Sequence, residues 1–231
     1  MTDWLGPAEW QAVALSLKVS LWATVLSLPL GIFTAHALAR WQFPGKQIVN
    51  GLVHLPLVLP PVVTGYLLLL AFGANTAFGG FMDSIGLPLA FRWTGAALAA
   101  AVMAFPLMVR AIRLSIEAVD PGLEEAAATL GASRPWVFMT ITLPLIVPGV
   151  LAGSVLAFAK AMGEFGATIT FVANIPGQTQ TLPSAVYAFL QVPGGESAAG
   201  RLVVVAIIIA MSALILSEWL ARRVAKKVGG T

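Results

Sequence analysis

The chain has 231 residues, of which 58% are hydrophobic and 10% charged, and its formal net charge is +3. A soluble domain carries about 25% charged residues, so this chain has too few charges to coat a water-exposed surface and is expected to lie in a lipid bilayer. Without cysteine it cannot form disulfides, thiolate metal sites or cysteine nucleophiles. The basic excess fits cytoplasmic loops of a membrane protein better than nucleic-acid binding.

Five stretches approach the roughly 20 apolar residues that a helix needs to cross the hydrocarbon core. They are residues 13–39, 48–74, 94–109, 137–159 and 202–217. Pro56, Pro60 and Pro61 lie in the second stretch and predict a kink or broken turn near Leu59. The first stretch is too long for the core of a signal peptide, so we expect it to be a retained helix.

Basic residues mark alternate connections between these stretches. Arg40 and Lys46 lie in the first connection, Arg110, Arg113 and Arg134 in the third, and four more basic residues follow the last stretch. By contrast, residues 166–200 contain no basic residue. Because basic residues collect in cytoplasmic loops, the pattern predicts an external N-terminus and a cytoplasmic C-terminus, which agrees with an odd number of spans.

Residues 167–193 are too polar to span the membrane and too apolar for an ordinary loop. Broken, glycine-rich backbone is tolerated at membrane depth where protein buries it or a cavity hydrates it. A lid over a translocation path and a simple surface loop are both open interpretations, and a sixth short span would reverse the N-terminus. Separately, Gly149, Gly153, Ala157 and Ala161 recur every four residues and predict a close helix–helix contact.

Residues 120–136 predict a short helix, a sharp turn and a second helix at the cytoplasmic surface. Asp120 can cap the first helix, and Pro121 suits its first position. Glu124 and Glu125 lie near the positive end of the helix dipole. Gly131 can adopt the left-handed conformation that ends the helix.

This segment resembles the signature of the membrane subunits of type I ABC importers. That signature is Glu-Ala-Ala, three residues, Gly, nine residues and Ile-x-Leu-Pro, and it matches 125–127, 131 and 141–144 here. The resemblance implies an all-α membrane protein with the type I importer transmembrane fold, about five transmembrane helices and a cytoplasmic coupling helix. The transmembrane domain would cover 12–220, with the coupling-helix loop at 120–136 and a basic cytoplasmic tail at 221–231.

In this family the coupling helix docks on a separate ATP-hydrolysing subunit. The resemblance therefore implies an ATPase contact made by Glu124, Glu125, Ala126, Ala127, Gly131, Leu143 and Pro144. The chain has no Gly-x4-Gly-Lys-Ser/Thr loop and no constellation for catalysis, so we expect a non-catalytic subunit without cofactor or metal. The implied partners are a second copy of the chain, two ATP-binding subunits, an external binding protein and the lipid of the bacterial cytoplasmic (inner) membrane.

Two further segments resemble those of molybdate permeases: residues 56–66, Pro-Leu-Val-Leu-Pro-Pro-Val-Val-Thr-Gly-Tyr, and residues 161–183. The core Gly-Glu-Phe-Gly at 163–166 is shared with sulfate permeases. The resemblance thus favours import of molybdate, and of the similar dianion tungstate, and implies that the external partner is a molybdate-binding protein. A sulfate or thiosulfate importer is the alternative, and a stand-alone anion channel or carrier is a third reading, which the coupling signature disfavours.

The expected translocation path includes polar and small residues from these segments, namely Thr64, Lys160, Glu164, Gly166, Thr168 and Thr170. Ionisable groups at membrane depth are functional candidates. Lys160 and Glu164 are also four residues apart and can pair with each other on one helix face. A structural pair and a transport role are both open at this point.

Overall fold

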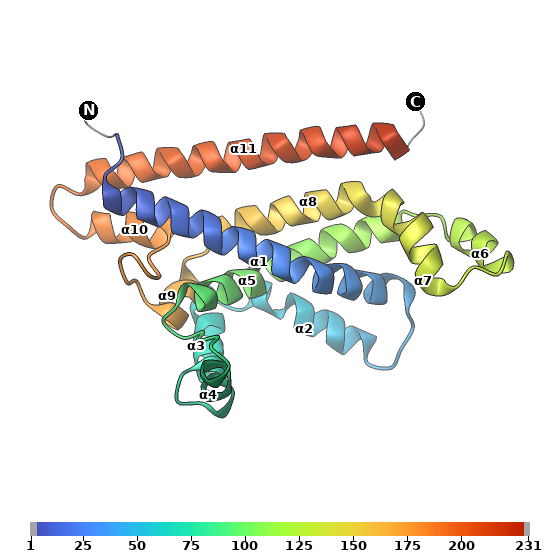
Figure 1. Ribbon diagram of the computed structural model, residues 1–231, viewed down its shortest axis with the longest axis horizontal. Helices are drawn as coiled ribbons and strands as arrows, with labels where there is room; N and C mark the ends of the chain where they lie inside the picture. The colour runs from blue at the N-terminus through green and yellow to red at the C-terminus, as the bar shows by residue number, and fades with distance from the viewer. Residues whose placement is uncertain (1–3, 229–231) are drawn as a thin grey trace.

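The computed structural model describes residues 4–228, and this part of the chain is helical, with no strand (Figure 1). The long helices are α1 (Pro7–Arg40), α5 (Trp93–Glu117), α8 (Leu143–Met162) and α11 (Glu196–Val228). The shorter ones are α2 (Lys46–Val58), α3 (Pro61–Phe72), α4 (Ala77–Ser84), α6 (Pro121–Thr129), α7 (Arg134–Val137), the π-helical turn η1 (Phe138–Thr142), α9 (Gly166–Val172) and α10 (Leu182–Leu190).

Within residues 4–228, four continuous helical stretches are long and apolar enough to cross a membrane: Pro7–Arg40, Trp93–Glu117, Arg134–Met162 and Glu196–Leu220. The predicted second span is divided into α2 and α3, which meet at an angle of 116°. The break confirms the predicted kink, because Leu59 is extended and Pro60 has no N–H to continue the helix. The expected five spans are therefore reached only when this bent pair counts as one.

Several helices are longer than the hydropathy of the sequence indicates. α5 continues to Glu117, so Arg110 and Arg113 lie in its last turns and not in a loop as expected. An ion pair between Arg113 and Glu117, 2.7 Å long, supports this end of the helix. α11 likewise continues through most of the predicted basic tail, and residues 229–231 of that tail lie outside the described residues.

Residues 167–193 form two short helices, α9 and α10, rather than a surface loop. At 7 and 9 residues they are about 10 and 14 Å long, far short of the roughly 30 Å hydrocarbon core, so neither is a sixth span. The side chains of Ala167, Phe171 and Ala185 are fully buried. The surface-loop interpretation is therefore wrong for α9 and for one face of α10, which pack against the bundle, whereas Gly177 and residues 190–193 are exposed.

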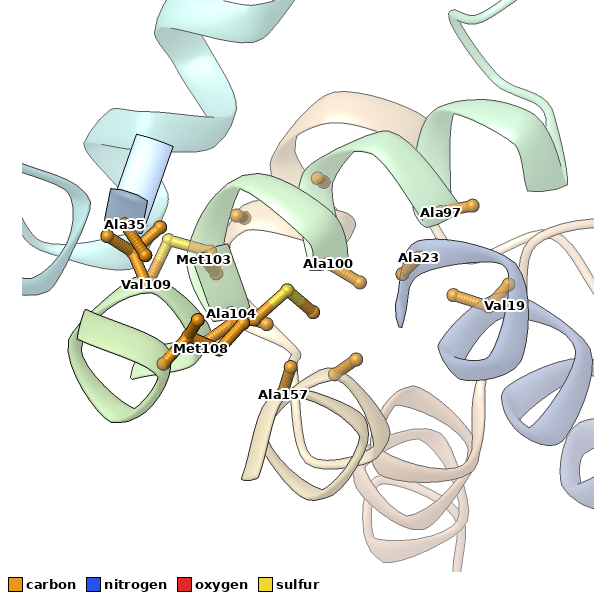
Figure 2. Packing of buried hydrophobic residues seen from close by; sticks show 14 of the residues in the cluster. Val19, Ala23, Ala35, Ala97, Ala100, Met103, Ala104, Met108, Val109 and Ala157 are labelled. Atoms are coloured by element: carbon orange, nitrogen blue, oxygen red, sulfur yellow. The ribbon is translucent and has the colours of Figure 1, made fainter. Parts of the chain in front are cut away.

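The core lies between α1, α5 and α8, with α11 along one side and α2 to α4 on the other (Figure 1). Figure 2 shows Met103, Met108 and Val109 of α5 beside Ala35 of α1 and Ala157 of α8. The predicted small-residue face of α8 lies against α5. A Cβ on Gly149 would be 1.7 Å from the Ser115 Oγ, and one on Gly153 would be 3.1 Å from the Met108 carbonyl oxygen.

The two ends of this bundle differ. At one end α1 begins beside α10 and the start of α11, where Glu9 and Arg201 form an ion pair of 2.9 Å. At the other end α1 and α5 finish beside α6 and α7, and the C-terminal end of α11 lies on the same side (Figure 1). The start of α1 and α6 are thus separated by the length of the bundle (Figure 1).

Candidate coupling and translocation sites

α6, the predicted coupling helix, has the local structure that its sequence indicates. The Asp120 carboxylate accepts a hydrogen bond of 2.9 Å from the Gly122 N–H, and Pro121 is the first helical residue. Gly131 follows the helix with φ of +86° and makes the turn. Ser133 then occupies the cap position of α7. Each of these features depends on neighbouring residues, which is why the sequence alone predicts them.

The surface of α6 and the following turn carries several exposed apolar side chains. Leu130 is 89% exposed, and Leu123 and Trp136 are about half exposed. Exposure of large apolar side chains to water costs free energy, and their burial against a partner surface is favourable. The exposed Glu125 and Ala126 lie in the same segment.

The residues expected to contact the ATPase do not all face outward. Ala127 is buried, Leu143 is partly buried, and Pro144 is exposed. Glu124 turns inward, where its Oε2 lies 3.1 Å from the Nε of Arg40. Its Oε1 accepts a hydrogen bond of 2.6 Å from the hydroxyl of Thr142. Adjacent helical residues point about 100° apart, so the two glutamates occupy different surroundings.

A groove of about 1,210 Å³ lies beside α6 and between the ends of α1 and α7. The rings of Phe33, His36, Trp41 and Phe138 line it together with Arg134. These rings also pack edge to face, as between His36 and Phe138 at 4.8 Å. The groove gives the α6 end of the bundle a concave surface next to the exposed apolar residues.

The two segments that resemble molybdate permeases come into direct contact, although about a hundred residues of sequence separate them. They meet where α3 crosses α9. A Cβ on Gly65 would be 2.5 Å from the Ala167 carbonyl oxygen and 2.9 Å from Cβ of Thr170. A Cβ on Gly166 would be 2.7 Å from Cβ of Pro61. Glycine at 65 and 166 therefore lets the two backbones approach, as small residues do in membrane bundles.

The threonines of this contact differ in their hydrogen bonding. Thr168 donates to the Phe165 carbonyl at 2.9 Å, and Thr170 donates to the Gly166 carbonyl at 2.9 Å. These hydroxyls are thus used within α9 itself. The hydroxyl of Thr64 is buried and has no hydrogen-bond partner in the structure. Thr64 is therefore the member of the predicted path with an unused polar group.

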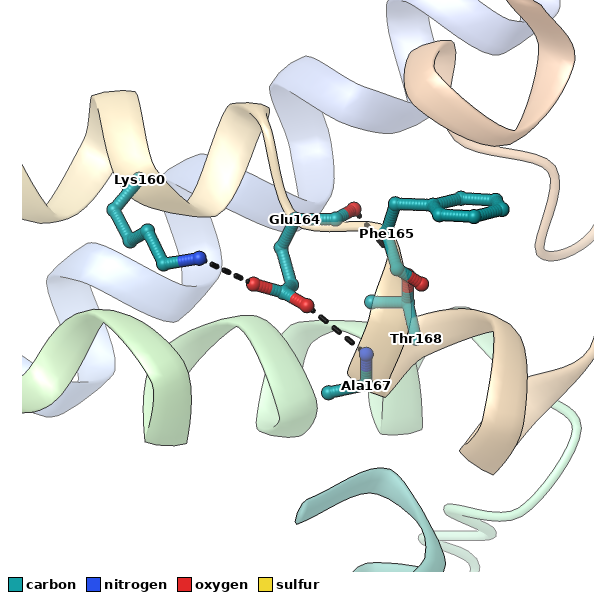
Figure 3. A network of polar contacts seen from close by, with 5 residues as sticks. All are labelled: Lys160, Glu164, Phe165, Ala167 and Thr168. Carbon is teal, nitrogen blue, oxygen red and sulfur yellow. Dashed lines mark hydrogen bonds and ion pairs between the residues drawn. The ribbon is translucent and has the colours of Figure 1, made fainter. Parts of the chain in front are cut away.

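Lys160 and Glu164 form the predicted pair, with Nζ and Oε2 separated by 2.7 Å (Figure 3). The two residues do not share one helix, because α8 ends at Met162. Glu164 lies in the break before α9, where its other oxygen accepts a hydrogen bond of 3.0 Å from the Ala167 N–H. The Glu164 side chain is 1% exposed and that of Lys160 is 31% exposed. Glu164 consequently neutralises Lys160 and ties α8 to the first turn of α9.

Sequence reasoning missed Arg40 and Thr142 as parts of the coupling region. Arg40 counted only as a basic loop residue, and Thr142 is the unspecified position in the Ile-x-Leu-Pro motif. Their role depends on contacts with Glu124 across distant parts of the sequence. The opposite charges of Arg40 and Glu124 were the available signals, but nothing in the sequence indicates that the two side chains meet.

The amino-acid sequence of the chain is similar to those of membrane proteins of bacterial transport systems. Residues 27–230 match the family model described as "Binding-protein-dependent transport system inner membrane component". The "Molybdenum transport system permease protein ModB" of Escherichia coli K12 is 60% identical over 226 residues, which cover 97% of this chain and 99% of that protein. The "Sulfate transport system permease protein CysT" of Salmonella typhimurium LT2 is 31% identical, over 95% of this chain and 80% of that protein.

Solved structures show the same fold at low sequence identity. A bacterial ABC transporter involved in the import of the acidic polysaccharide alginate aligns with a TM-score of 0.73 at 19% identity, covering 94% of this chain and 80% of that one. This architecture is therefore that of ABC importer membrane subunits. With the family match across most of its length, the chain belongs to the binding-protein-dependent transport system inner membrane component family.

Proposed function

We propose that this chain is the membrane permease subunit of an ATP-driven importer that moves molybdate, and tungstate as a dianion of nearly the same size, across the bacterial inner membrane. The observation that carries the proposal is 60% identity over nearly the whole chain with a protein named as a molybdenum permease. The relative named as a sulfate permease shares 31% identity. The two segments that resemble molybdate permeases also meet at the contact between α3 and α9.

The energy for transport comes from a separate subunit in this proposal. The sequence has no nucleotide-binding loop, whereas α6 presents exposed Glu125, Ala126 and Leu130 as a docking surface. A short, capped helix can transmit a rigid-body movement from such a partner into the helices that follow it. Leu143 and Pro144 begin α8, which would carry that movement into the membrane.

A second copy of the chain would complete the translocation path. Each copy supplies four continuous spans and one bent pair, too few to surround a path by themselves. α2 has no buried residue, and its Ile48, Leu52 and Val58 are exposed. The complete importer would thus hold two permease chains, two ATPase subunits and an external binding protein that delivers the anion.

The path itself would hold the anion weakly. A dianion is costly to desolvate, and a strong cationic site at mid-membrane would retain it. Lys160 is already neutralised by Glu164, so the path offers Thr64, Gly166 and the other small residues of α3 and α9 in place of a free cation. Selectivity would then reside in the external binding protein.

The orientation follows from the distribution of charge. α6 would face the cytoplasm, where the ATPase is, together with Arg113, Arg134 and the end of α11. The N-terminal end of α1 would face the exterior, since it lies at the opposite end of the bundle (Figure 1).

Competition uptake tests the substrate. The permease, its ATPase and its binding protein are reconstituted in lipid vesicles, and uptake of labelled molybdate is measured against a hundredfold excess of unlabelled tungstate or sulfate. Tungstate should abolish the signal and sulfate should leave most of it. Robust uptake of labelled sulfate with little uptake of molybdate would reject the substrate and leave the importer architecture standing.

A further inference from the structure

Arg40, the last residue of α1, contacts the segment that carries α6 at two separate points. Its Nη2 donates a hydrogen bond of 2.9 Å to the carbonyl oxygen of Val119, which directly precedes the cap of α6. Its Nε lies 3.1 Å from Oε2 of Glu124, in the first turn of α6. One side chain from the end of a membrane span thus holds both the entry to α6 and its first turn.

Glu124 extends this connection to the start of α8. Its second carboxylate oxygen accepts a 2.6 Å hydrogen bond from the hydroxyl of Thr142, whose side chain is almost fully buried. Thr142 is the last residue of η1, and η1 leads directly into α8. Glu124 therefore links α1 to α8, because one of its oxygens contacts Arg40 and the other contacts Thr142. A hydrogen bond to a charged acceptor such as this carboxylate is stronger than one between neutral groups.

The π-helical turn makes this junction structurally distinct. The N–H of Leu143 donates to the carbonyl of Phe138, five residues earlier, which is the π pattern. Pro144 follows, and its ring would collide with the carbonyl four residues before it in a regular α-helix. The ring of His36, on α1, packs at 4.8 Å on that of Phe138. Both ends of η1 are therefore in contact with groups tied to α1, and such turns often lie at functional sites.

We propose that Arg40 is a positioning residue that, through Glu124 and Thr142, fastens α6 to α1 and α8 so that the three move as one unit when the ATPase subunit moves. The proposal rests on the proposed function of the chain as an importer permease. It assigns Glu124 to an internal connection and leaves the exposed Glu125 to the ATPase surface.

The geometry distinguishes this connection from an ordinary surface ion pair. The side chains of Arg40 and Glu124 are each only 19% exposed, and each makes a second polar contact. Exposed ion pairs that lack such additional partners contribute little to the stability of a protein. The pair of Arg113 and Glu117 lies at the same end of the bundle but joins two residues of α5, so it serves as a matched control that cannot disconnect α6.

The test measures the number of ATP molecules hydrolysed per anion imported by the complete transporter in vesicles. Arg40→Cys with Glu124→Cys removes the connection, and the chain has no other cysteine. We expect this ratio to rise at least about fivefold, the lower range of measured couplings between sites, while the ATPase remains bound. A flexible thiol-specific crosslinker that joins the two introduced cysteines replaces the link between α1 and α6 but not the bonds to Val119 and Thr142, so it should bring the ratio part of the way back to the wild-type value. Glu117→Gln should leave it at the wild-type value.

An unchanged ratio before crosslinking, a raised ratio that crosslinking does not lower at all, or loss of the ATPase subunit from the complex would each overturn the proposal. Arg40→Lys is a milder variant for the case in which the double-variant chain does not fold and insert in the membrane. It keeps a cation for Glu124 but cannot also hold Val119, so the ratio should rise by a smaller amount, and no rise would overturn the proposal. If the wild type imports sulfate and not molybdate, the substrate is wrong, and the same ratio is then measured with sulfate.

Discussion

Gly65→Ala tests whether α3 and α9 need to be in contact at the backbone. The added Cβ would lie 2.5 Å from the carbonyl oxygen of Ala167 and 2.9 Å from its Cα. Ordinary contacts begin at about 3.4 Å, and backbone atoms cannot rotate away as a flexible side chain can. The two helices must therefore separate by about 1 Å or distort locally, which loosens the packing around Thr64 and Thr170.

The magnitude follows from a comparison with a second glycine. Gly51→Ala is the control, because Gly51 lies within α2 and a Cβ there would meet nothing within 4 Å. Both substitutions gain the helix preference of alanine, about 0.5–1 kcal/mol. Their difference thus isolates the overpacking of α3 on α9, for which we expect about 1–3 kcal/mol. For a chain of this size each kcal/mol shifts the melting temperature by roughly 2–4 °C.

The assay heats the purified complex in detergent and measures the fraction that still elutes as an intact particle, with anion uptake measured in parallel. Gly65→Ala should melt several degrees below Gly51→Ala and import more slowly, while Gly51→Ala should match or exceed the wild type. If the two variants melt together and both import normally, the close approach of α3 and α9 is refuted as a requirement.

Three other predictions follow from the structure. Gly131→Val should lower transport and binding-protein-stimulated ATP hydrolysis together, because a φ of +86° costs a β-branched residue about 1–2 kcal/mol. Gly131→Asn should be tolerated, and normal coupled transport by the Val variant would contradict the role of the turn. Lys160→Met should destabilise the complex by about 3 kcal/mol, because it leaves the buried carboxylate of Glu164 without a counter-ion. Adding Glu164→Gln should recover most of the lost stability in thermal unfolding. If it recovers none, loss of the ion pair is not the cause of the destabilisation. A cysteine that replaces Ser133 should react with an impermeant label only from the cytoplasm, and one that replaces Glu196 should react only from the exterior. The reverse result would invert the topology.

Features that depend on neighbouring residues could be predicted from the sequence. Asp120, Pro121 and Gly131 determine the ends of α6 through their own backbone preferences, and the prolines around Leu59 broke the second span where expected. The four-residue spacing of Lys160 and Glu164 predicted their pairing, but the end of α8 between them was not visible.

Features that depend on distant contacts could not be predicted. The threonines of α9 lower the hydropathy of this segment, so the sequence did not predict a helix there. In the structure the Thr170 hydroxyl donates a hydrogen bond to the carbonyl of Gly166. The apolar residues of α9 are buried by α3 and α5 rather than by lipid. The inward direction of Glu124 depends on Arg40, at the end of another helix. Hydropathy underestimated α5 because its last turns carry the charged residues Arg113 and Glu117, which pair with each other within the helix.

The most direct test of the central claim is the initial rate of labelled molybdate uptake by vesicles that hold the permease with its ATPase, as a function of where ATP and the binding protein are placed. The account predicts uptake only when the binding protein is on the face where α1 begins and ATP is on the face that carries α6. Uptake that proceeds at the same rate without ATP, or without the binding protein, would contradict it and would identify the chain as a channel or carrier.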